Sequence, residues 1–268
     1  MLKVAIMITS CDAYADCWKP MIFSLDKYWP NCEWPRYIVT NYKEDNSLPN
    51  TEFVKVGDDK RSWCNLARKG LEAIDADYVL FFQEDYWLGR RVDNEAIKAH
   101  VKYMDENHVD YLKIQDDIRR DDLRIGVSDY CMNPIDMRYA FNTAIAFWRK
   151  TAIPQLLPTD WNGWQFERQI TPYVKVHNIQ INSQALYSPL YATKGMKTIP
   201  EDAIVRGVWT PAAVKFMKEN GFEDVLAQRE VMGPFNQWVR KHCPGHQSVF
   251  RWPFWAVLHV LNKYKLNW

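Results

Sequence analysis

Two carboxylates follow directly on a continuous apolar run in the first third of the sequence. Residues 78–82 read Tyr-Val-Leu-Phe-Phe, and Gln83, Glu84 and Asp85 come next without a turn residue. An apolar run without polar alternation is typical of a strand buried on both faces of a parallel sheet. The carboxyl ends of such strands form the edge at which open α/β sheets bind ligands. We therefore expect Glu84 and Asp85 to lie at a ligand site; the alternative is a pair of solvated acids leaving a strand.

A third acidic side chain suited to chemistry is Glu167. It stands within residues 160–169, close in sequence to Trp164 and Phe166. Aromatic neighbours exclude water, and a carboxylate deprived of water is disfavoured in its charged form and becomes a better proton acceptor. Glu167 is therefore a candidate general base. The alternative is a glutamate on a helix surface that pairs with Arg168.

The elements that would position these acids begin with an alternation of strands and helices. Strands are expected at residues 3–9, 37–40, 53–56 and 78–82, and helices at residues 15–28 and after an N-cap at Ser62. This order builds the first half of a doubly wound α/β layer with a parallel sheet. The predicted fold class is therefore α/β.

Small polar side chains follow the first two predicted strands. Thr9 and Asp12 stand at the end of the first strand, and Asn41 stands at the end of the second. These ends share one edge of a parallel sheet, where such groups can hydrogen-bond a nucleoside. Neither a G-x-G-x-x-G nor a G-x-x-x-x-G-K-[S/T] pattern follows Thr9. A dinucleotide site and a P-loop are therefore disfavoured.

The second half of the chain is less regular. Strands are expected at residues 111–115, 139–148 and 174–186, helices at residues 93–107 and 212–219, and a charged, irregular loop at residues 116–136. The last helix has Thr210 as its predicted N-cap and Pro211 at its first position. Arg206 precedes it in a glycine-containing segment, where a guanidinium could clamp a diphosphate. A surface arginine is the alternative.

Composition limits the classes of partner. The formal charge of the 268 residues is +1, and acids and bases are interspersed, so no global field recruits nucleic acid. The chain holds 13 Trp, 14 Tyr and 12 Phe, which favours ligands with flat faces because such rings stack on sugars and bases.

Cysteine usage and hydropathy bear on the compartment. The six cysteines form neither a C-x-x-C pair nor a cluster spaced with histidines, which predicts reduced thiols. No cleavage region precedes the first strand, and no run reaches the roughly 18 apolar residues of a membrane span. We therefore expect a cytoplasmic protein.

The carboxyl-terminal tail, residues 250–268, is short, aromatic and basic. The tail carries three tryptophans and two lysines that favour a helix lying at a membrane interface, peripheral on the inner face of the membrane: Trp252, Trp255, Trp268, Lys263 and Lys265. A terminal helix packed on the domain is the alternative. The predicted division is a domain over residues 1–220 and a helical extension over residues 221–268.

Three stretches of this sequence resemble the GT-A-type glycosyltransferases of bacterial surface polysaccharide and lipopolysaccharide assembly. They are residues 77–88, residues 141–150 with 164–167, and residues 203–211. The first is similar to the strand that ends in the Asp-x-Asp motif of that family. The second is similar to the region where inverting members place their catalytic carboxylate. The third is similar to the segment that closes over the donor.

The resemblance implies a GT-A-like (Rossmann-like), mostly parallel central sheet flanked by helices, over residues 1 to about 220. It implies transfer of a hexose from a nucleotide-diphosphate donor to a hydroxyl of a glycan or lipid-linked glycan. Glu167 would be the general base of an inverting displacement. Thr9, Asp12 and Asn41 would hold the nucleoside, and the aromatic candidates for stacking on base or sugar are Trp63 and Trp164.

One departure from the family bears on the metal. The Asp-x-Asp motif stands here as Gln83, Glu84 and Asp85, so that Gln replaces the first acid. The resemblance implies a divalent cation, Mn²⁺ or Mg²⁺, with Asp85 as its main protein ligand beside the donor. The substitution leaves metal dependence open, because Arg61 or Arg206 could instead stabilise the leaving diphosphate as fixed cations.

Two other functions remain open. A sugar nucleotidyltransferase would use similar substrates, but the glycine-rich, lysine-containing loop of such enzymes is missing after the first strand, where residues 9–12 read Thr-Ser-Cys-Asp. A catalytically silent, membrane-associated module that binds nucleotide sugars is the other alternative. Donor-induced stabilisation without turnover would favour that module.

Overall fold

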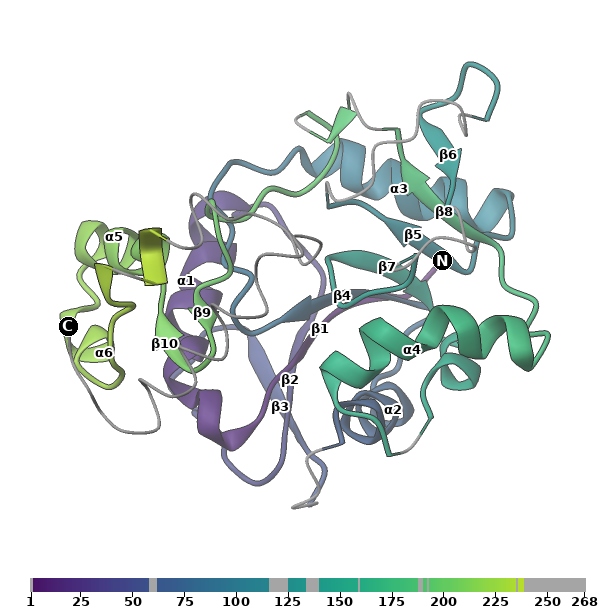
Figure 1. Cartoon of the computed structure of the whole chain (residues 1–268). Helices are drawn as coiled ribbons and strands as arrows, with labels where there is room; N and C mark the ends of the chain where they lie inside the picture. The colour runs from purple at the N-terminus through teal and green to yellow at the C-terminus, as the bar shows by residue number, and fades with distance from the viewer. Residues whose placement is uncertain are drawn as a thin grey trace.

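The architecture was obtained from a computed structural model of the whole chain (Figure 1). The structure describes residues 2–57, 62–115, 125–133, 140–158, 160–187, 190–191, 193–234 and 236–238. Arg61, the acidic pairs of residues 116–117 and 121–122, and the tail of residues 250–268 lie outside these ranges.

A mixed sheet of eight strands forms the centre of the described molecule, in the order β3-β2-β1-β4-β7-β5-β8-β6. Its strands are β1 (Val4–Thr9), β2 (Arg36–Thr40), β3 (Thr51–Lys55), β4 (Tyr78–Gln83), β5 (Tyr111–Lys113), β6 (Tyr130–Met132), β7 (Ala146–Arg149) and β8 (Ser183–Leu186). The first four pair in parallel, as the sequence predicts. β7 enters antiparallel between β4 and β5, and β6 is antiparallel to β8.

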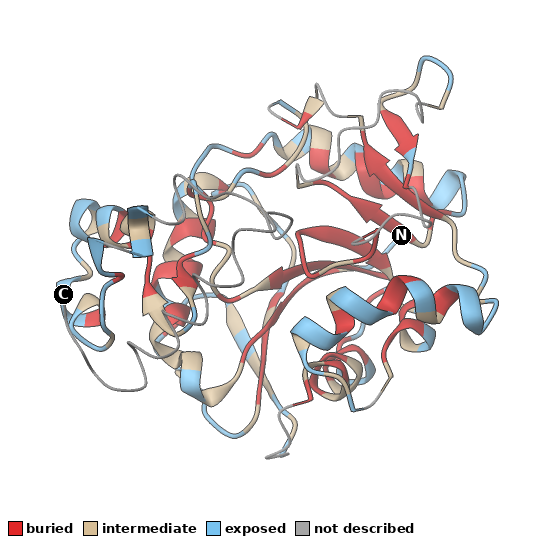
Figure 2. Cartoon of the chain, viewed as in Figure 1, coloured by how far each residue is buried: buried red, intermediate tan, exposed pale blue. Residues whose placement is uncertain are grey.

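Helices cover both faces of this sheet. They are α1 (Trp18–Tyr28), α2 (Trp63–Ala73), α3 (Asn94–Glu106), α4 (Gly163–Val176), α5 (Pro211–Asn220) and α6 (Glu223–Leu226), with 3₁₀ segments at η1 (Asp12–Cys17) and η3 (Ile153–Leu156). Alternate residues of β1 enter different cores: Ile6 and Ile8 pack with α1 and α3, while Ala5 and Met7 pack with α2 and α4. The sheet is accordingly buried on both sides (Figure 2), which confirms the interpretation of the apolar runs.

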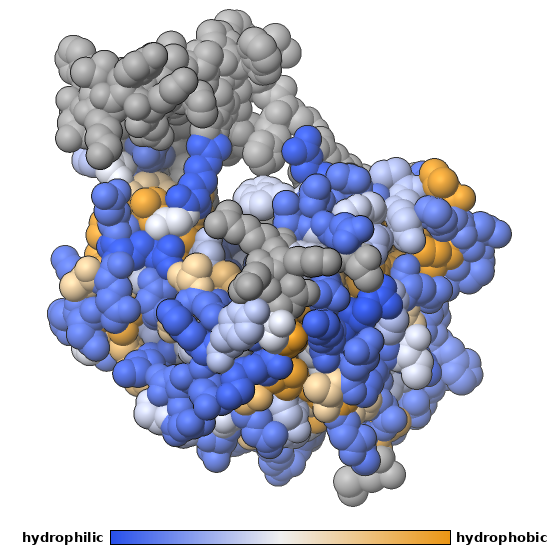
Figure 3. All heavy atoms as spheres, turned by 90° about the horizontal axis from the view of Figure 1, so that it is seen from below, coloured by the Kyte–Doolittle hydropathy of each residue, from blue (hydrophilic) through white to orange (hydrophobic). Residues whose placement is uncertain are grey.

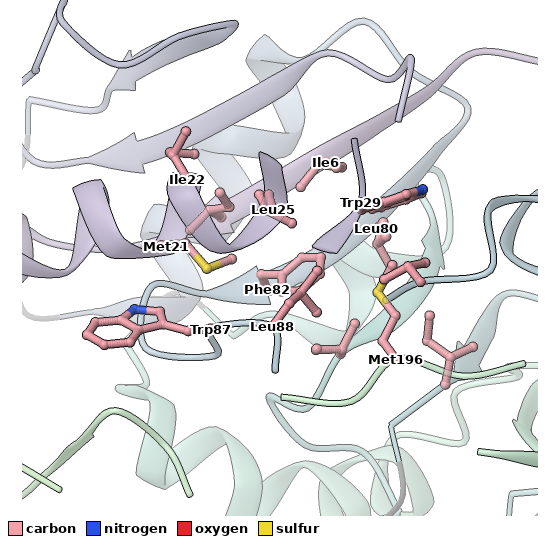
Figure 4. Close-up of a cluster of buried hydrophobic side chains, with 14 of the residues drawn as sticks. Ile6, Met21, Ile22, Leu25, Trp29, Leu80, Phe82, Trp87, Leu88 and Met196 are labelled. Atoms are coloured by element: carbon pink, nitrogen blue, oxygen red, sulfur yellow. The ribbon is translucent and has the colours of Figure 1, made fainter. Parts of the chain in front are cut away.

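The core on the α1 face fixes the strands that lead to the candidate site. Met21, Ile22 and Leu25 of α1 lie over the sheet near Ile6 of β1 and Phe82 of β4 (Figure 4). Each of these side chains is almost completely buried. Burial of one such side chain contributes about 2 kcal/mol to folding. This packing holds β1 and β4 in place, and with them the residues that follow the two strands.

Local signals place the helix starts. Ser62 caps α2 by accepting a hydrogen bond from the backbone N–H of Asn65, as predicted. Asn162 and Gln165 form a reciprocal capping box at the start of α4. Thr210 caps α5, which follows a hairpin of β9 (Ile204–Val205) and β10 (Val208–Trp209).

The structure corrects three expectations in the second half. Of the strand expected at residues 139–148, the structure describes residues 140–148, and among these only β7 (Ala146–Arg149) is extended. Residues 140–145 form bends that side chains hold; Gln115 Oε1, for example, accepts a hydrogen bond from the N–H of Ile145. The strand expected at residues 174–186 shortens to β8, because α4 continues its buried stripe to Val174. β6 lies within the expected loop of residues 116–136.

The segment after α5 packs back onto the sheet-bearing body. Val225 of α6 and Met232 are buried, and the backbone at Val231 bridges to Trp209 of β10. Hydrophilic residues predominate on the described surface seen from below (Figure 3). Within the described ranges, every helix is too short or too polar to cross a membrane.

Candidate active site

The ends of β1, β2 and β4 meet at one edge of the sheet. Thr9 at the end of β1 pairs in register with Val39 of β2 and with Gln83 of β4. The loops beyond these strands also meet, since the N–H of Asp12 donates to Asn41 Oδ1 at 3.4 Å. The structure therefore brings the predicted polar groups together at the carboxyl edge.

Asp12 and Asn41 hold two loops in a fixed relation. Asp12 Oδ1 accepts hydrogen bonds of 3.0 Å from the backbone N–H groups of Tyr42 and Lys43. Both Asp12 and Asn41 are half-buried. The arrangement leaves them at the surface of the edge, where a ligand can reach them.

Thr9 and Trp63 lie beneath that edge. The Thr9 hydroxyl donates to the carbonyl of Phe82 at 3.3 Å and accepts a 3.1 Å hydrogen bond from Trp63 Nε1. Thr9 is 1% exposed, and the Trp63 ring packs against Phe81 and Phe166. Their polar atoms serve the protein itself, so these two residues support the edge from within.

Glu84 is a buried carboxyl group. Burial raises the pKa of Glu84 to about 7; the charge of Asp16 acts in the same direction, whereas the charge of Arg229 opposes it. Near neutral pH this carboxyl therefore exchanges between its neutral and charged forms.

Asp85 carries a polar atom without a partner. Asp85 Oδ1 is buried and makes no hydrogen bond, although the residue as a whole is half-buried. Burial, followed by the charges of Glu84 and Asp202, raises the pKa of Asp85 well above its usual range, and the backbone amide of Ile204 opposes the shift. A buried oxygen without a hydrogen-bond partner destabilises the folded protein unless a ligand or a cation binds it.

Glu167 is anchored by one oxygen. Its Oε1 accepts a 3.1 Å hydrogen bond from the backbone N–H of Thr143 and a second from Thr143 Oγ1. Glu167 is half-buried on α4. Hydrogen bonds from Thr143 therefore orient this carboxylate, whereas the sequence interpretation relied on aromatic neighbours.

Tyr86 joins the two acidic groups that the sequence singled out. Its hydroxyl lies 3.5 Å from Thr143 Oγ1, the atom that also binds Glu167. Burial, together with the charges of Asp202, Asp85 and Glu167, raises the pKa of Tyr86 well above its usual range. The charges of Asp85 and Glu167, which are distant in sequence, therefore both act on this phenol.

Two of the remaining sequence candidates have exposed side chains. Trp164 is 69% exposed on the outer side of α4. Arg206 is exposed at the tip of the β9–β10 hairpin, where positive φ angles at Arg206 and Gly207 form the two-residue turn. Arg61 lies outside the described residues.

Sequence reasoning missed an ion pair beside Glu84. Arg229 donates from Nε and Nη2 to the two oxygens of Asp16, both at 2.8 Å, and from Nη1 to the carbonyl of Gly207. Its guanidinium also lies over the rings of Tyr14 and Trp209. No local pattern could reveal this pair, because 213 positions separate the two charges.

Three further residues of the cluster were also missed, namely Tyr86, Thr143 and Asp202. Two signals were present: Tyr86 follows the acidic pair directly, and Thr143 belongs to a stretch that carries the family resemblance. Asp202 precedes the segment expected to close over a donor. Its charge acts on Asp85 and on Tyr86.

The residues at Asp85 fit a cation that relies on few protein ligands. Among the described residues, no group of three or more His, Cys, Asp or Glu side chains has the arrangement of a metal site. Mg²⁺ and Mn²⁺ nevertheless bind many enzymes through one or two carboxylates, water and substrate phosphates. The orphaned Asp85 Oδ1 offers one such ligand.

Comparison with known proteins gives a likeness of fold. No protein-family model and no curated protein sequence matches this chain. Residues 1–349 of S. aureus TarS, solved in complex with UDP-GlcNAc, align over 85% of this chain and 71% of that chain, with 14% identity and a TM-score of 0.50. The complex with UDP aligns over 95% of this chain and 78% of that chain, with 13% identity and the same TM-score. This chain shares its fold with TarS.

The likeness confirms the predicted fold class, a GT-A-like, mostly parallel sheet flanked by helices. The chain covers only 38% of a longer TarS structure, which matches with 14% identity and a TM-score of 0.48 over 75% of this chain. Identities at this level establish the fold alone.

Proposed function

We propose that the protein is a glycosyltransferase that moves a sugar from a nucleotide-diphosphate donor to a hydroxyl group of a glycan or lipid-linked glycan. The fold likeness to TarS, solved with UDP-GlcNAc and with UDP, supports this proposal. The observation that carries it is internal to this chain. Thr143 binds Glu167 and its hydroxyl lies 3.5 Å from that of Tyr86, which directly follows Asp85 beyond β4, beside the edge where α/β sheets bind ligands.

In the proposed reaction, Glu167 is the general base of a single, inverting displacement. Thr143 occupies Oε1, which leaves Oε2 to take the proton of the acceptor hydroxyl. As the acceptor oxygen bonds to the anomeric carbon, the bond from that carbon to the diphosphate oxygen breaks. The nucleoside diphosphate leaves with the electron pair, and the proton stays on Glu167.

The donor lies along the carboxyl edge in this proposal. Asp12 and Asn41 bind the nucleoside, and Thr9 with Trp63 keeps the end of β1 in place beneath it. Glu84 and Asp85 face the donor sugar and diphosphate. Arg206 at the hairpin tip, and Arg61, are the cations assigned to the leaving diphosphate.

In this proposal, Asp85 is a ligand of a divalent cation. Mn²⁺ or Mg²⁺ held by Asp85 Oδ1 would neutralise charge on the diphosphate. We expect Mn²⁺ to increase the thermal stabilisation produced by a UDP-sugar in the wild-type protein, and not in Asp85→Asn. An equal increase in both proteins would show that Asp85 does not bind the cation.

The decisive experiment replaces the proposed base. Glu167→Gln keeps the shape of the side chain and its contacts with Thr143, but cannot accept the proton. We expect transfer to fall by about 10²–10⁴-fold, while a nucleotide sugar still raises the melting temperature. The matched control is Glu106→Gln, an exposed change on α3 that should leave both readouts unchanged.

Three outcomes contradict parts of the proposal. Near-normal transfer by Glu167→Gln would exclude Glu167 as the base. Retention of the anomeric configuration in the product, followed by NMR, would exclude a single displacement. Thermal stabilisation by nucleotide sugars with no turnover in the wild-type protein would favour a silent binding module, and formation of a nucleotide sugar from nucleoside triphosphate would favour a nucleotidyltransferase.

A further inference from the structure

The hydroxyl of Thr143 lies between the side chains of Tyr86 and Glu167. Thr143 Oγ1 donates to Glu167 Oε1 and lies 3.5 Å from the Tyr86 hydroxyl. The backbone N–H of Thr143 donates to the same Oε1 at 3.1 Å. Thr143 is 2% exposed, so bulk water competes little for its hydroxyl. The three side chains therefore form one series of polar contacts, which begins directly after the acidic pair that follows β4.

The protonation of the three groups fixes the direction of these hydrogen bonds. A charged Glu167 can only accept, so the single hydrogen of the Thr143 hydroxyl points to Oε1. The Tyr86 hydroxyl must then be the donor in its contact with Thr143. It keeps its proton at neutral pH, because burial and the charges of Asp202, Asp85 and Glu167 raise the pKa of Tyr86 well above its usual range. The hydrogen bonds therefore run from Tyr86 through Thr143 to Glu167.

The bend that carries Thr143 is held by a hydrogen bond of its own. Asn142 Oδ1 accepts a 3.1 Å hydrogen bond from the N–H of Ala144. Two residues after that bend, β7 begins and pairs with β4. The position of the Thr143 hydroxyl is therefore set by the backbone on both sides of it.

The backbone around Tyr86 is tied to the segment that precedes β9. The carbonyl of Asp85 accepts a 2.9 Å hydrogen bond from the N–H of Ala203, and the carbonyl of Trp87 accepts one of 2.9 Å from the N–H of Ile199. The Trp87 side chain is completely buried. These contacts do not involve the phenol, so loss of the Tyr86 hydroxyl leaves them in place.

We propose that Tyr86 is a positioning residue for the base, and that it acts through the hydroxyl of Thr143. This inference rests on the proposed function and adds a residue to the same site. The hydrogen bond from Tyr86 polarises the Thr143 hydroxyl and strengthens its hydrogen bond to Oε1. Oε1 is thereby kept on Thr143, and Oε2 remains for the acceptor. No proton moves along the series.

The length of the contact between Tyr86 and Thr143 agrees with this role. A separation of 3.5 Å is long for a hydrogen bond between hydroxyl groups. Hydrogen bonds of active sites are often long without substrate and tighten in the complex. Because Tyr86 directly follows Asp85, the residue that positions the base and the residue assigned to the donor belong to one short segment.

Carbon NMR of the protein labelled with ¹³C at the glutamate carboxyl groups follows the charge of Glu167 without substrate. The signal of Glu167 is identified by its loss in Glu167→Gln. We expect the titration midpoint of this signal to lie at higher pH in Tyr86→Phe and in Thr143→Val than in the wild type, because the charged form has lost hydrogen-bond support. Thr143→Ser keeps the hydroxyl and should titrate as the wild type does.

A double variant distinguishes action through Thr143 from two separate effects. Tyr86→Phe combined with Thr143→Val should move the midpoint no further than Thr143→Val alone, because the hydroxyl on which Tyr86 acts is already missing. In the transfer assay used for Glu167→Gln, kcat should fall about tenfold in Tyr86→Phe. The KM for the donor should stay unchanged, because Tyr86 acts on the base.

The control is Tyr103→Phe, which removes a phenol hydroxyl that donates to Gln184 Oε1 at 2.8 Å on another part of the sheet. It should change neither the midpoint nor kcat. An unchanged midpoint in Tyr86→Phe would overturn the inference. So would an equal shift in Tyr103→Phe, or a double variant whose shift equals the sum of the two single shifts.

Failure of the proposed function gives a different pattern. If Glu167→Gln retains normal transfer, Glu167 is not the base, and the midpoints alone then decide whether Tyr86 acts on this carboxyl group. If Glu167→Gln is inactive and Tyr86→Phe shifts the midpoint but keeps a normal kcat, the role of Tyr86 in the reaction is overturned while the base assignment stands.

Discussion

At the scale of single residues, the buried acids after β4 destabilise the folded protein when they are charged. Burial disfavours the charged forms of Glu84 and Asp85, and the charge of Glu84 further raises the pKa of Asp85. The charge of Arg229 opposes this effect at Glu84, and nearby backbone amides oppose it at both residues. Perturbed carboxyl groups of this kind cluster at functional sites. The pair is therefore better explained by a ligand that brings positive charge or hydrogen-bond donors than by folding.

The cost of Glu84 has a measurable dependence on pH. Its pKa of about 7 in the folded protein lies above its ordinary value of 4.5, so the folded state holds the proton more tightly between these values. The wild type should lose stability as the pH rises from about 4.5 to about 7, and lose no more through this group above that. Glu84→Gln should therefore exceed the wild type in its free energy of unfolding by about 3 kcal/mol at pH 8 and match it near pH 4. Urea unfolding at a series of pH values measures this difference, and a constant difference across that range would contradict the assignment.

At the scale of elements, Arg229 ties three segments together. It joins the chain after α6 to η1 through Asp16 and to the β9–β10 hairpin through Gly207. The side chains of Arg229 and Asp16 are only 15% and 8% exposed. The loop that carries Asp12 and the hairpin that carries Arg206 therefore depend on one guanidinium for their relative position.

Removal of that guanidinium should be costly. Arg229→Gln leaves Asp16 buried without its partner, and breaking a buried pair in this way destabilises a protein by about 3–5 kcal/mol. Lys215→Gln breaks an exposed i,i+4 contact with Glu219, and should cost less than about 0.5 kcal/mol. Chemical unfolding of both variants makes the comparison. A loss for Arg229→Gln as small as that for Lys215→Gln would show that water reaches the pair freely.

At the scale of the whole molecule, the described body is an eight-stranded sheet with helices on both faces and a separate β9–β10 hairpin, and residues 222–232 pack onto it. The tail of residues 250–268 lies outside the described residues. Its aromatic and basic composition remains the basis for proposing peripheral attachment to an anionic membrane surface. Such a location would suit a lipid-linked acceptor.

Deletion of residues 250–268 tests the attachment. The full chain should sediment with vesicles of phosphatidylglycerol and phosphatidylcholine, and added salt should weaken this association. The shortened chain should remain in the supernatant while its melting temperature stays within a few degrees of the full chain. If the shortened chain sediments with vesicles as the full chain does, the tail does not attach the protein to membranes, and the alternative of a helix packed on the domain is favoured.

Local pattern in the sequence determined the first half of the fold and the position of the edge. The strands from β1 to β4 and the caps at Ser62 and Thr210 follow from hydrophobic periodicity and capping chemistry, which act between residues close in the chain. The same pattern indicated that Glu84 and Asp85 end a buried strand. It failed at residues 139–148, where hydrogen bonds from distant side chains override a strand-like composition.

Only the tertiary structure decided how the acids meet. Thr143 orients Glu167 across 24 positions, Tyr86 reaches Thr143 across 57, and Arg229 reaches Asp16 across 213. The two contacts of Thr143 depend on the antiparallel entry of β7 beside β4 and on the packing of α4, which no short-range pattern encodes. Burial then sets the protonation of Glu84, because the loss of water around a carboxyl group is a property of the folded interior and not of its neighbours in sequence.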